Sequence, residues 1–103
     1  MSFKLRFVQK FEQRNTEAFM ELEAEFARLE KELAEFPKGR RYVPYMSRDP
    51  VNTLVWEADF PTLREAIDAK LFFEADTRHE DLFSKQVKYF IESYVEIFRS
   101  VCD

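Results

Sequence analysis

Residues 16–39 carry the sequence TEAFMELEAEFARLEKELAEFPKG, and this stretch decides how the rest of the chain is interpreted. Its apolar side chains recur at steps of three and four, as they do on one face of a helix. They are Phe19, Leu22, Phe26, Leu29, Leu33 and Phe36. Asn15 or Thr16 can cap the start of this helix, and Pro37 with Gly39 just beyond ends it. The sequence therefore predicts one long amphipathic helix.

Seven glutamates occupy the other faces of this helix, against only two cations, Arg28 and Lys31. The acids are Glu17, Glu21, Glu23, Glu25, Glu30, Glu32 and Glu35. We expect them to form a solvated face, although such a surface could also meet a basic partner.

Alternating apolar and polar residues predict strands on both sides of the helix. Residues 2–11 follow this period of two, and so do residues 53–60. The polar sides of the two strands could exchange cross-strand ion pairs. The residues concerned are Lys4, Arg6 and Lys10 on the first strand and Glu57 and Asp59 on the second.

Two further strands are expected at the edges of the sheet. Residues 40–48 favour a strand that contains Pro44, and a proline cannot donate to a strand ladder. A turn follows at Asp49-Pro50. The last segment fits a continuing helix or a strand by periodicity alone. The β-branched and aromatic residues of 93–101 favour a strand.

Two capping boxes follow the strand at 53–60. Thr62 pairs with Glu65, and Thr77 pairs with Glu80. In each box the hydroxyl accepts one free backbone N–H while the glutamate reaches back to another. The sequence therefore predicts two short helices separated by a break.

The predicted order is β-α-β-β-α-α-β in a single domain of residues 1–103. This is an α+β, ferredoxin-like arrangement with a four-stranded antiparallel sheet and helices on one face. Right-handed crossovers place the first and third strands at the centre and the second and fourth at the edges.

The composition excludes several classes of protein. A chain of 103 residues with 46% hydrophobic residues and twelve Phe predicts a soluble globular domain rather than disorder. A net charge of −4 gives no footprint for nucleic acid. Cys102 is the only cysteine, so no internal disulfide and no cysteine metal cluster can form. With no signal sequence and no membrane-length apolar run, we expect a cytoplasmic protein with no membrane partner.

Three stretches carry a family resemblance: GRRYVPY at 39–45, NTLVWE at 52–57 and FFEADTRHEDLF at 72–83. With them the sequence resembles the small dimeric α+β barrel proteins, NIPSNAP-like ones in particular, and more loosely the antibiotic-biosynthesis-type monooxygenases. The resemblance implies a homodimer in which the sheets of two copies pack together. It also implies a cavity between the sheet and the helices of each protomer.

Two residues take their candidate roles from this resemblance. In monooxygenase-like relatives, an aromatic residue on the sheet and a histidine on a helix line the cavity, which implies Trp56 and His79 here. From the residues alone, a tryptophan in the place of Trp56 is usually a core residue, and His79 is a polar residue in the first turn of a helix, which needs no special explanation. A single histidine predicts neither a metal site nor a bound cofactor.

A basic and aromatic cluster surrounds the predicted edge strand. It comprises Lys38, Arg40, Arg41, Tyr42, Tyr45 and Arg48. Its charges protect the strand edge against aberrant pairing, which is the interpretation we favour. Alternatively, arginines that face a cavity could hold a carboxylate or phosphate ligand. The candidate cavity residues are thus Trp56, His79, Tyr42, Tyr45 and Arg41.

The functional hypothesis is a small protein that could bind an apolar or aromatic ligand in this cavity, with no catalytic residue assigned. One alternative is an oxygenase-type enzyme, cofactor-independent or haem-using. Another is a structural or protein-interaction module. RNA binding on the sheet is disfavoured, because the strand at 53–60 has no glycine and carries two acids.

Overall fold

Four antiparallel strands form one sheet with the order β2-β3-β1-β4. Residues 1–101 are described by a computed structural model of the chain, and Cys102 lies outside the described residues. The strands are β1 (Phe3–Phe11), β2 (Arg40–Tyr42), β3 (Thr53–Phe60) and β4 (Phe90–Arg99). The predicted fold class and the central position of the first and third strands are confirmed.

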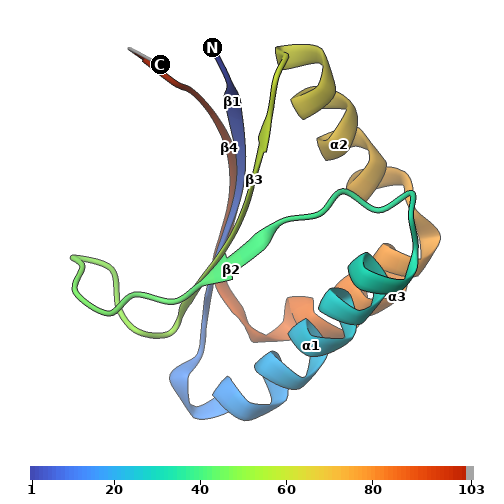
Figure 1. The fold of residues 1–103 in the computed structure, drawn as a ribbon. Helices are drawn as coiled ribbons and strands as arrows, with labels where there is room; N and C mark the ends of the chain where they lie inside the picture. Colours follow the sequence, from blue (N-terminus) through green and yellow to red (C-terminus); the bar gives the residue numbers. More distant parts are fainter. Residues whose placement is uncertain (102–103) are drawn as a thin grey trace.

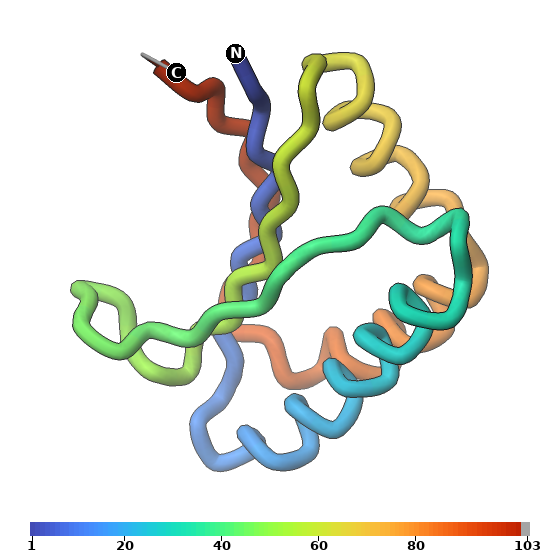
Figure 2. Tube along the Cα trace, in the orientation of Figure 1, coloured from blue at the N-terminus to red at the C-terminus, as the bar shows by residue number. Residues whose placement is uncertain are grey.

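Three helices cover one face of this sheet and leave the other face uncovered (Figure 1). They are α1 (Thr16–Glu32), α2 (Leu63–Ala75) and α3 (Thr77–Gln86), with short 3₁₀ turns η1 (Gln13–Asn15) and η2 (Val87–Tyr89). The loop between β2 and β3 extends beyond the uncovered face, away from the helices (Figure 2). Among residues 1–101, no helix is long and apolar enough to cross a membrane.

The register of β1 places alternate side chains on the two faces. Leu5 lies opposite Ala58, and Phe7 lies opposite Trp56, on the side of the helices. The core contains Leu5, Phe36, Trp56, Ala58, Ala69 and Phe73, and a second cluster joins Phe11, Phe19 and Leu54. The helices therefore pack on the apolar side of the sheet.

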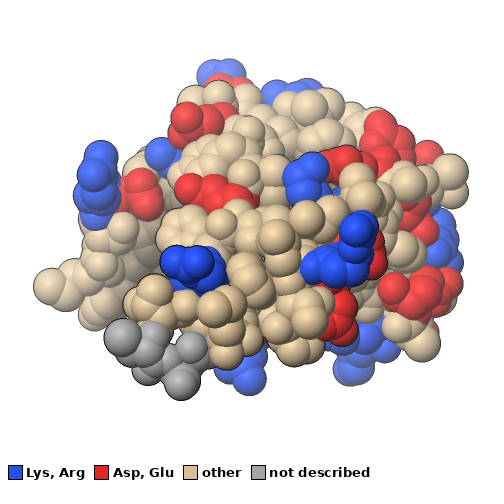
Figure 3. Space-filling view, turned by 90° about the horizontal axis from the view of Figure 1, so that it is seen from above, with Lys and Arg blue, Asp and Glu red and all other residues tan. Residues whose placement is uncertain are grey.

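The uncovered face carries the ion pairs expected between the central strands. Lys4 Nζ lies 3.3 Å from Glu57 Oε1, and Arg6 Nε lies 2.9 Å from Glu57 Oε2. Lys10 contacts Asp49 and Glu92 rather than an acid of β3. From above the molecule, cationic and anionic side chains are interspersed with wide uncharged areas (Figure 3).

Two predicted strand limits were wrong. Only Arg40–Tyr42 of the segment 40–48 forms a strand, because the chain turns away before Pro44, which has no N–H for the ladder. The last strand begins at Phe90 rather than residue 93, because a register shift at Lys10/Phe11 lets Phe90 pair with Phe11.

The end of α1 also differs from prediction. Helix α1 ends at Glu32 rather than at Pro37, so that Phe36 turns inward against Phe72 and Phe73, with ring centroids 5.0 and 6.3 Å apart. The Lys38 ammonium then donates to the Leu33 carbonyl at 2.7 Å. It compensates the free carbonyls at this helix end.

Of the two predicted N-cap residues, one is confirmed and one is wrong. Thr62 caps α2 as predicted, since its hydroxyl accepts from the Glu65 N–H at 3.1 Å. Helix α3 is capped by Asp76 instead of Thr77, because the carboxylate accepts from the backbone N–H groups of both Arg78 and His79. The Arg78 side chain binds the same carboxylate and holds the pKa of Asp76 below its usual value.

Candidate functional site

A cavity of about 350 Å³ lies between the sheet and the three helices. Its walls are mainly aromatic, from Phe7, Phe26, Phe36, Trp56, Phe73 and Phe83. Trp56 meets the rings of Phe7 and Phe73 edge to face, at centroid distances of 5.6 and 5.2 Å. These contacts fix the rings in place, so the cavity has defined apolar walls.

Helix α1 turns two acidic residues toward this cavity. Its buried positions are Phe19, Glu23, Phe26 and Glu30, which follow steps of four, three and four. The expectation that all seven glutamates are solvated is therefore wrong for Glu23 and Glu30, of which only 5% and 7% is exposed. The physical reason is a cation on the neighbouring strand that compensates both carboxylates.

That cation is Arg41 of β2. Its Nε donates to Glu23 Oε2 at 2.6 Å, and its Nη2 donates to Glu30 Oε2. Burial alone would lower the pKa of Arg41, but the two carboxylates raise it above its usual value. Arg41 therefore stays charged and ties the strand to the helix.

Neutral donors complete the coordination of the two carboxylates. The Trp56 indole N–H lies 3.1 Å from Glu30 Oε2, and the Gly39 N–H lies 3.1 Å from Glu30 Oε1. Gln86, fully buried, donates from Nε2 to Glu23 Oε1 at 3.1 Å. Each carboxylate thus has a partner on both oxygens, as buried charges require.

Gly39 is required at its position by the indole. A Cβ atom there would lie 2.2 Å from Trp56 Cε2, far inside van der Waals contact. The absence of a side chain lets the backbone N–H approach Glu30 beside the Trp56 ring. The only glycine of the sequence therefore leaves room for Trp56, which lines the cavity.

His79 lies in the aromatic part of the cavity. Its ring centroid is 4.9 Å from that of Phe26, 5.1 Å from that of Phe73, and 6.1 Å from that of Phe83. Burial lowers the pKa of His79, although nearby carboxylates oppose this shift. Neither ring nitrogen makes a hydrogen bond to any residue of 1–101, so the neutral imidazole is free to bind a ligand.

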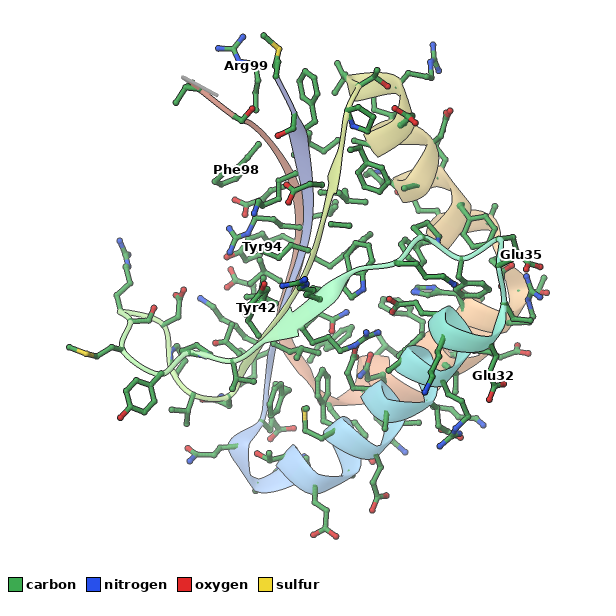
Figure 4. The ribbon with its side chains drawn as sticks, in the orientation of Figure 1. Glu32, Glu35, Tyr42, Tyr94, Phe98 and Arg99 are labelled. Carbon is green, nitrogen blue, oxygen red and sulfur yellow. The ribbon has the colours of Figure 1, made fainter. Side chains whose placement is uncertain are left out.

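The structure brings three of the five candidate residues together. Trp56, His79 and Arg41 all line the cavity. Tyr42 does not, because β2 alternates and directs it to the uncovered face, on which Tyr94 and Phe98 of the opposite edge strand also lie (Figure 4). Tyr45 lies in the loop after β2 and is 98% exposed.

Glu23, Glu30 and Gln86 belong to the site and were not predicted from the sequence. A signal for the two glutamates was present, since they alternate with Phe19 and Phe26 on one helix face. The residue that decides their burial, Arg41, lies on a different element, and periodicity within one helix cannot show it. Within residues 1–101, no group of three metal-binding side chains is present.

No protein-family model and no curated protein sequence matches the chain. Among solved structures, it is similar to a NIPSNAP family protein from Agrobacterium tumefaciens, with a TM-score of 0.76 at 9% identity over 99% of this chain and 95% of that one. An uncharacterized NIPSNAP domain protein from Burkholderia xenovorans gives a TM-score of 0.71 at 10% identity over 99% and 96% of the two chains. An antibiotic biosynthesis monooxygenase gives 0.72 at 13% identity over 96% and 98%.

These similarities define the class of fold: an α+β, ferredoxin-like protein with helices on one face of a four-stranded sheet. The neighbours are the NIPSNAP and monooxygenase-like proteins that the sequence resembles, so the predicted resemblance is confirmed at the level of fold.

Proposed function

We propose that this protein binds a small ligand with an aromatic or apolar body in the cavity between sheet and helices. The observation that carries the proposal is an aromatic-walled cavity that also contains a free imidazole and a hydrogen-bonded charge cluster. Ligand pockets are typically about 300–1,000 Å³ and combine apolar walls with a few placed polar groups. The 350 Å³ cavity has both properties.

Native mass spectrometry on freshly purified protein tests this proposal. We expect an added mass per protomer that disappears on denaturation. A Ser93→Phe variant places a ring in the cavity wall and should lose the added mass, whereas Ser84→Phe, on α3 outside the cavity, should retain it. Retention by both variants would contradict the proposed location, and wild-type protein that carries no added mass and gains none from a library of aromatic compounds would contradict ligand binding itself.

We also propose that the protein forms a homodimer through the uncovered sheet face. Tyr42, Tyr94 and Phe98 project from this face (Figure 4). The loop after β2, which contains the exposed Tyr45 and Met46, extends on the same side (Figure 2). The charged residues between them are already ion-paired within the protomer, so a second copy would not bury unpaired charge there. Sedimentation at micromolar concentration should give twice the 12.5 kDa protomer mass, and a monomer mass would exclude this assembly.

An oxygenase-type enzyme is a second candidate, and one observation favours it. The neutral, unbonded imidazole of His79 could accept a proton from an acidic O–H or C–H group of a bound molecule. Once the ligand is identified, oxygen consumption by wild-type protein and its loss in His79→Gln, with ligand binding retained, would support this candidate. Oxygen consumption that is the same in both proteins would exclude His79 from the reaction.

Haem does not fit the residues present. Its two propionates are anions, whereas the cavity offers one guanidinium that is already bound to two carboxylates. No step through haem is therefore derived. The cytoplasmic location expected from the sequence stays a prediction, and so does the alternative of an interaction module.

A further inference from the structure

We propose that the ligand of this cavity is an organic cation, a protonated amine or quaternary ammonium group on an apolar body. This inference rests on the proposed function and adds the charge of the ligand. Neither the fold nor the sequence resemblance suggests it. It comes from the balance of charges around the aromatic walls.

Acidic residues dominate the titratable groups that line the cavity. They are Glu23, Glu30, Glu74 and Glu80, against a single permanent cation, Arg41. His79 is the remaining titratable group among them with basic character, and burial holds its pKa low, so it adds no positive charge at neutral pH. The cavity therefore has an excess of negative charge.

The surrounding cations reduce this excess but do not remove it. Lys70 pairs with Glu74 on the same helix, and Arg78 is committed to Asp76 and Glu35. Lys38 donates to backbone carbonyls at the end of α1. Glu80 makes no ion pair within residues 1–101, and Arg41 is shared between two buried carboxylates.

The aromatic walls favour the same ligand charge. The face of a phenyl or indole ring is the negative end of its quadrupole and attracts an ammonium group that it contacts. Seven Phe, Trp and Tyr residues of the part of the chain that the structure describes line this cavity. A ring face that a ligand contacts in this cavity would repel an anion and attract a cation, and the carboxylates act in the same direction. Ring faces and net charge are separate properties of the site, and they agree.

The single tryptophan makes a direct test possible, because Trp56 lines the cavity and its fluorescence reports occupancy. Three probes share one benzyl group and differ in charge: benzyltrimethylammonium, benzyl alcohol and phenylacetate. Each is titrated while the fluorescence and the melting temperature are followed. We expect the cation to bind about tenfold or more tightly than benzyl alcohol, and phenylacetate to bind most weakly.

Two variants locate the effect in the cavity. Glu80→Gln removes a lining carboxylate that is exposed enough for the fold to tolerate the change, and should weaken binding of the cation severalfold while leaving benzyl alcohol unchanged. Glu21→Gln removes the same charge from the exposed face of α1, outside the cavity, and should change neither.

The possible outcomes separate this inference from the proposed function. Equal affinity for the cation and for benzyl alcohol, or tighter binding of phenylacetate, would overturn the inference and leave ligand binding in place. Equal effects of the two Glu→Gln variants would also overturn it, since attraction by net protein charge would then explain the preference. No response to any probe at millimolar concentration would overturn this inference, whereas ligand binding itself is decided by the native mass spectrometry described above.

Discussion

The two faces of the sheet each place an arginine between two glutamates, and the two arrangements differ in their surroundings. On the uncovered face, Arg6 binds Glu57 and Glu96 at 2.9 and 3.1 Å, and those carboxylate side chains are 19% and 35% exposed. On the covered face, Arg41 binds Glu23 and Glu30, whose side chains are 7% and 9% exposed. The same combination of one arginine and two glutamates forms a more solvated ion-pair network on one side and the polar part of a cavity on the other.

This comparison shows that burial, and not the presence of an ion pair, decides how much the fold depends on it. An exposed ion pair replaces hydration of the two charges by their mutual contact, and this adds little to the free energy of unfolding. A buried carboxylate cannot be hydrated when its partner is removed, so its charge stays uncompensated. The free-energy cost of losing each arginine is therefore the sharpest way to test the comparison.

Replacing Arg41 by Met should have the largest effect. It leaves Glu23 and Glu30 buried without a cation and should lower the free energy of unfolding by about 3–5 kcal/mol. The matched variant Arg6→Met should lower the free energy of unfolding of the monomer by about 1 kcal/mol or less, so both variants are compared at a protein concentration below that of dimer formation. Urea denaturation of both variants measures the difference, and equal losses would contradict the distinction between the faces.

Replacing Gly39 by Ala tests the packing on the covered face, because it adds a methyl group and changes no charge. The added methyl would lie 2.2 Å from the Trp56 ring, so the loop or the indole must move, and the Trp56–Glu30 hydrogen bond moves with it. We expect a loss of about 1–3 kcal/mol in the free energy of unfolding. Met46→Ala, in the exposed loop beyond the uncovered face, should change the free energy of unfolding of the monomer by about 0.5 kcal/mol or less. A neutral Gly39→Ala would mean that the indole does not pack against this glycine.

The pH dependence of stability tests the environment of His79. Because burial lowers its folded-state pKa, the unfolded chain takes up a proton first as the pH falls below about 6.5. Stability should therefore decrease from that pH down to the folded-state pKa, with a slope of at most about 1.4 kcal/mol per pH unit. His79→Gln should lack this loss. A decrease that persists in the variant would come from other groups, since the lowered pKa values of Asp76 and Glu35 act only in more acidic solution.

The smallest effect on protomer stability is expected at Tyr45. This side chain is almost fully exposed in the loop beyond the uncovered face, so Tyr45→Ser should change the free energy of unfolding of the monomer by about 0.5 kcal/mol or less. In the proposed dimer the same change removes contact area and should raise the dissociation constant. Sedimentation over a range of concentrations separates the two quantities, and an unchanged dissociation constant would place Tyr45 outside the interface.

The sequence predicted the fold well, because the properties that determine it are local. The alternation around Phe7 and Trp56 fixed the two central strands, and Pro44 indicated the edge position of the second. The site was predicted less well. Glu23 and Glu30 have the composition of a solvated helix face, and only the position of Arg41 on another element makes their burial favourable. Tyr42 was misplaced for the opposite reason, since a strand of three residues is too short for its alternation to be recognised.

The pairing of the first strand with the last has a consequence for the rate of folding. Ser2 and Ser100, 98 positions apart, are joined by a hydrogen bond, and β1 finds both of its neighbours, β3 and β4, far along the chain. Non-local pairings require large loops to close before any contact offsets the lost entropy, so chains rich in them fold in milliseconds to seconds rather than microseconds. During synthesis, more than forty residues must be added after β1 before the first strand that pairs with it, β3, begins. Its apolar side, with Leu5 and Phe7, is exposed throughout that interval, which makes this strand the segment most in need of protection before the sheet closes.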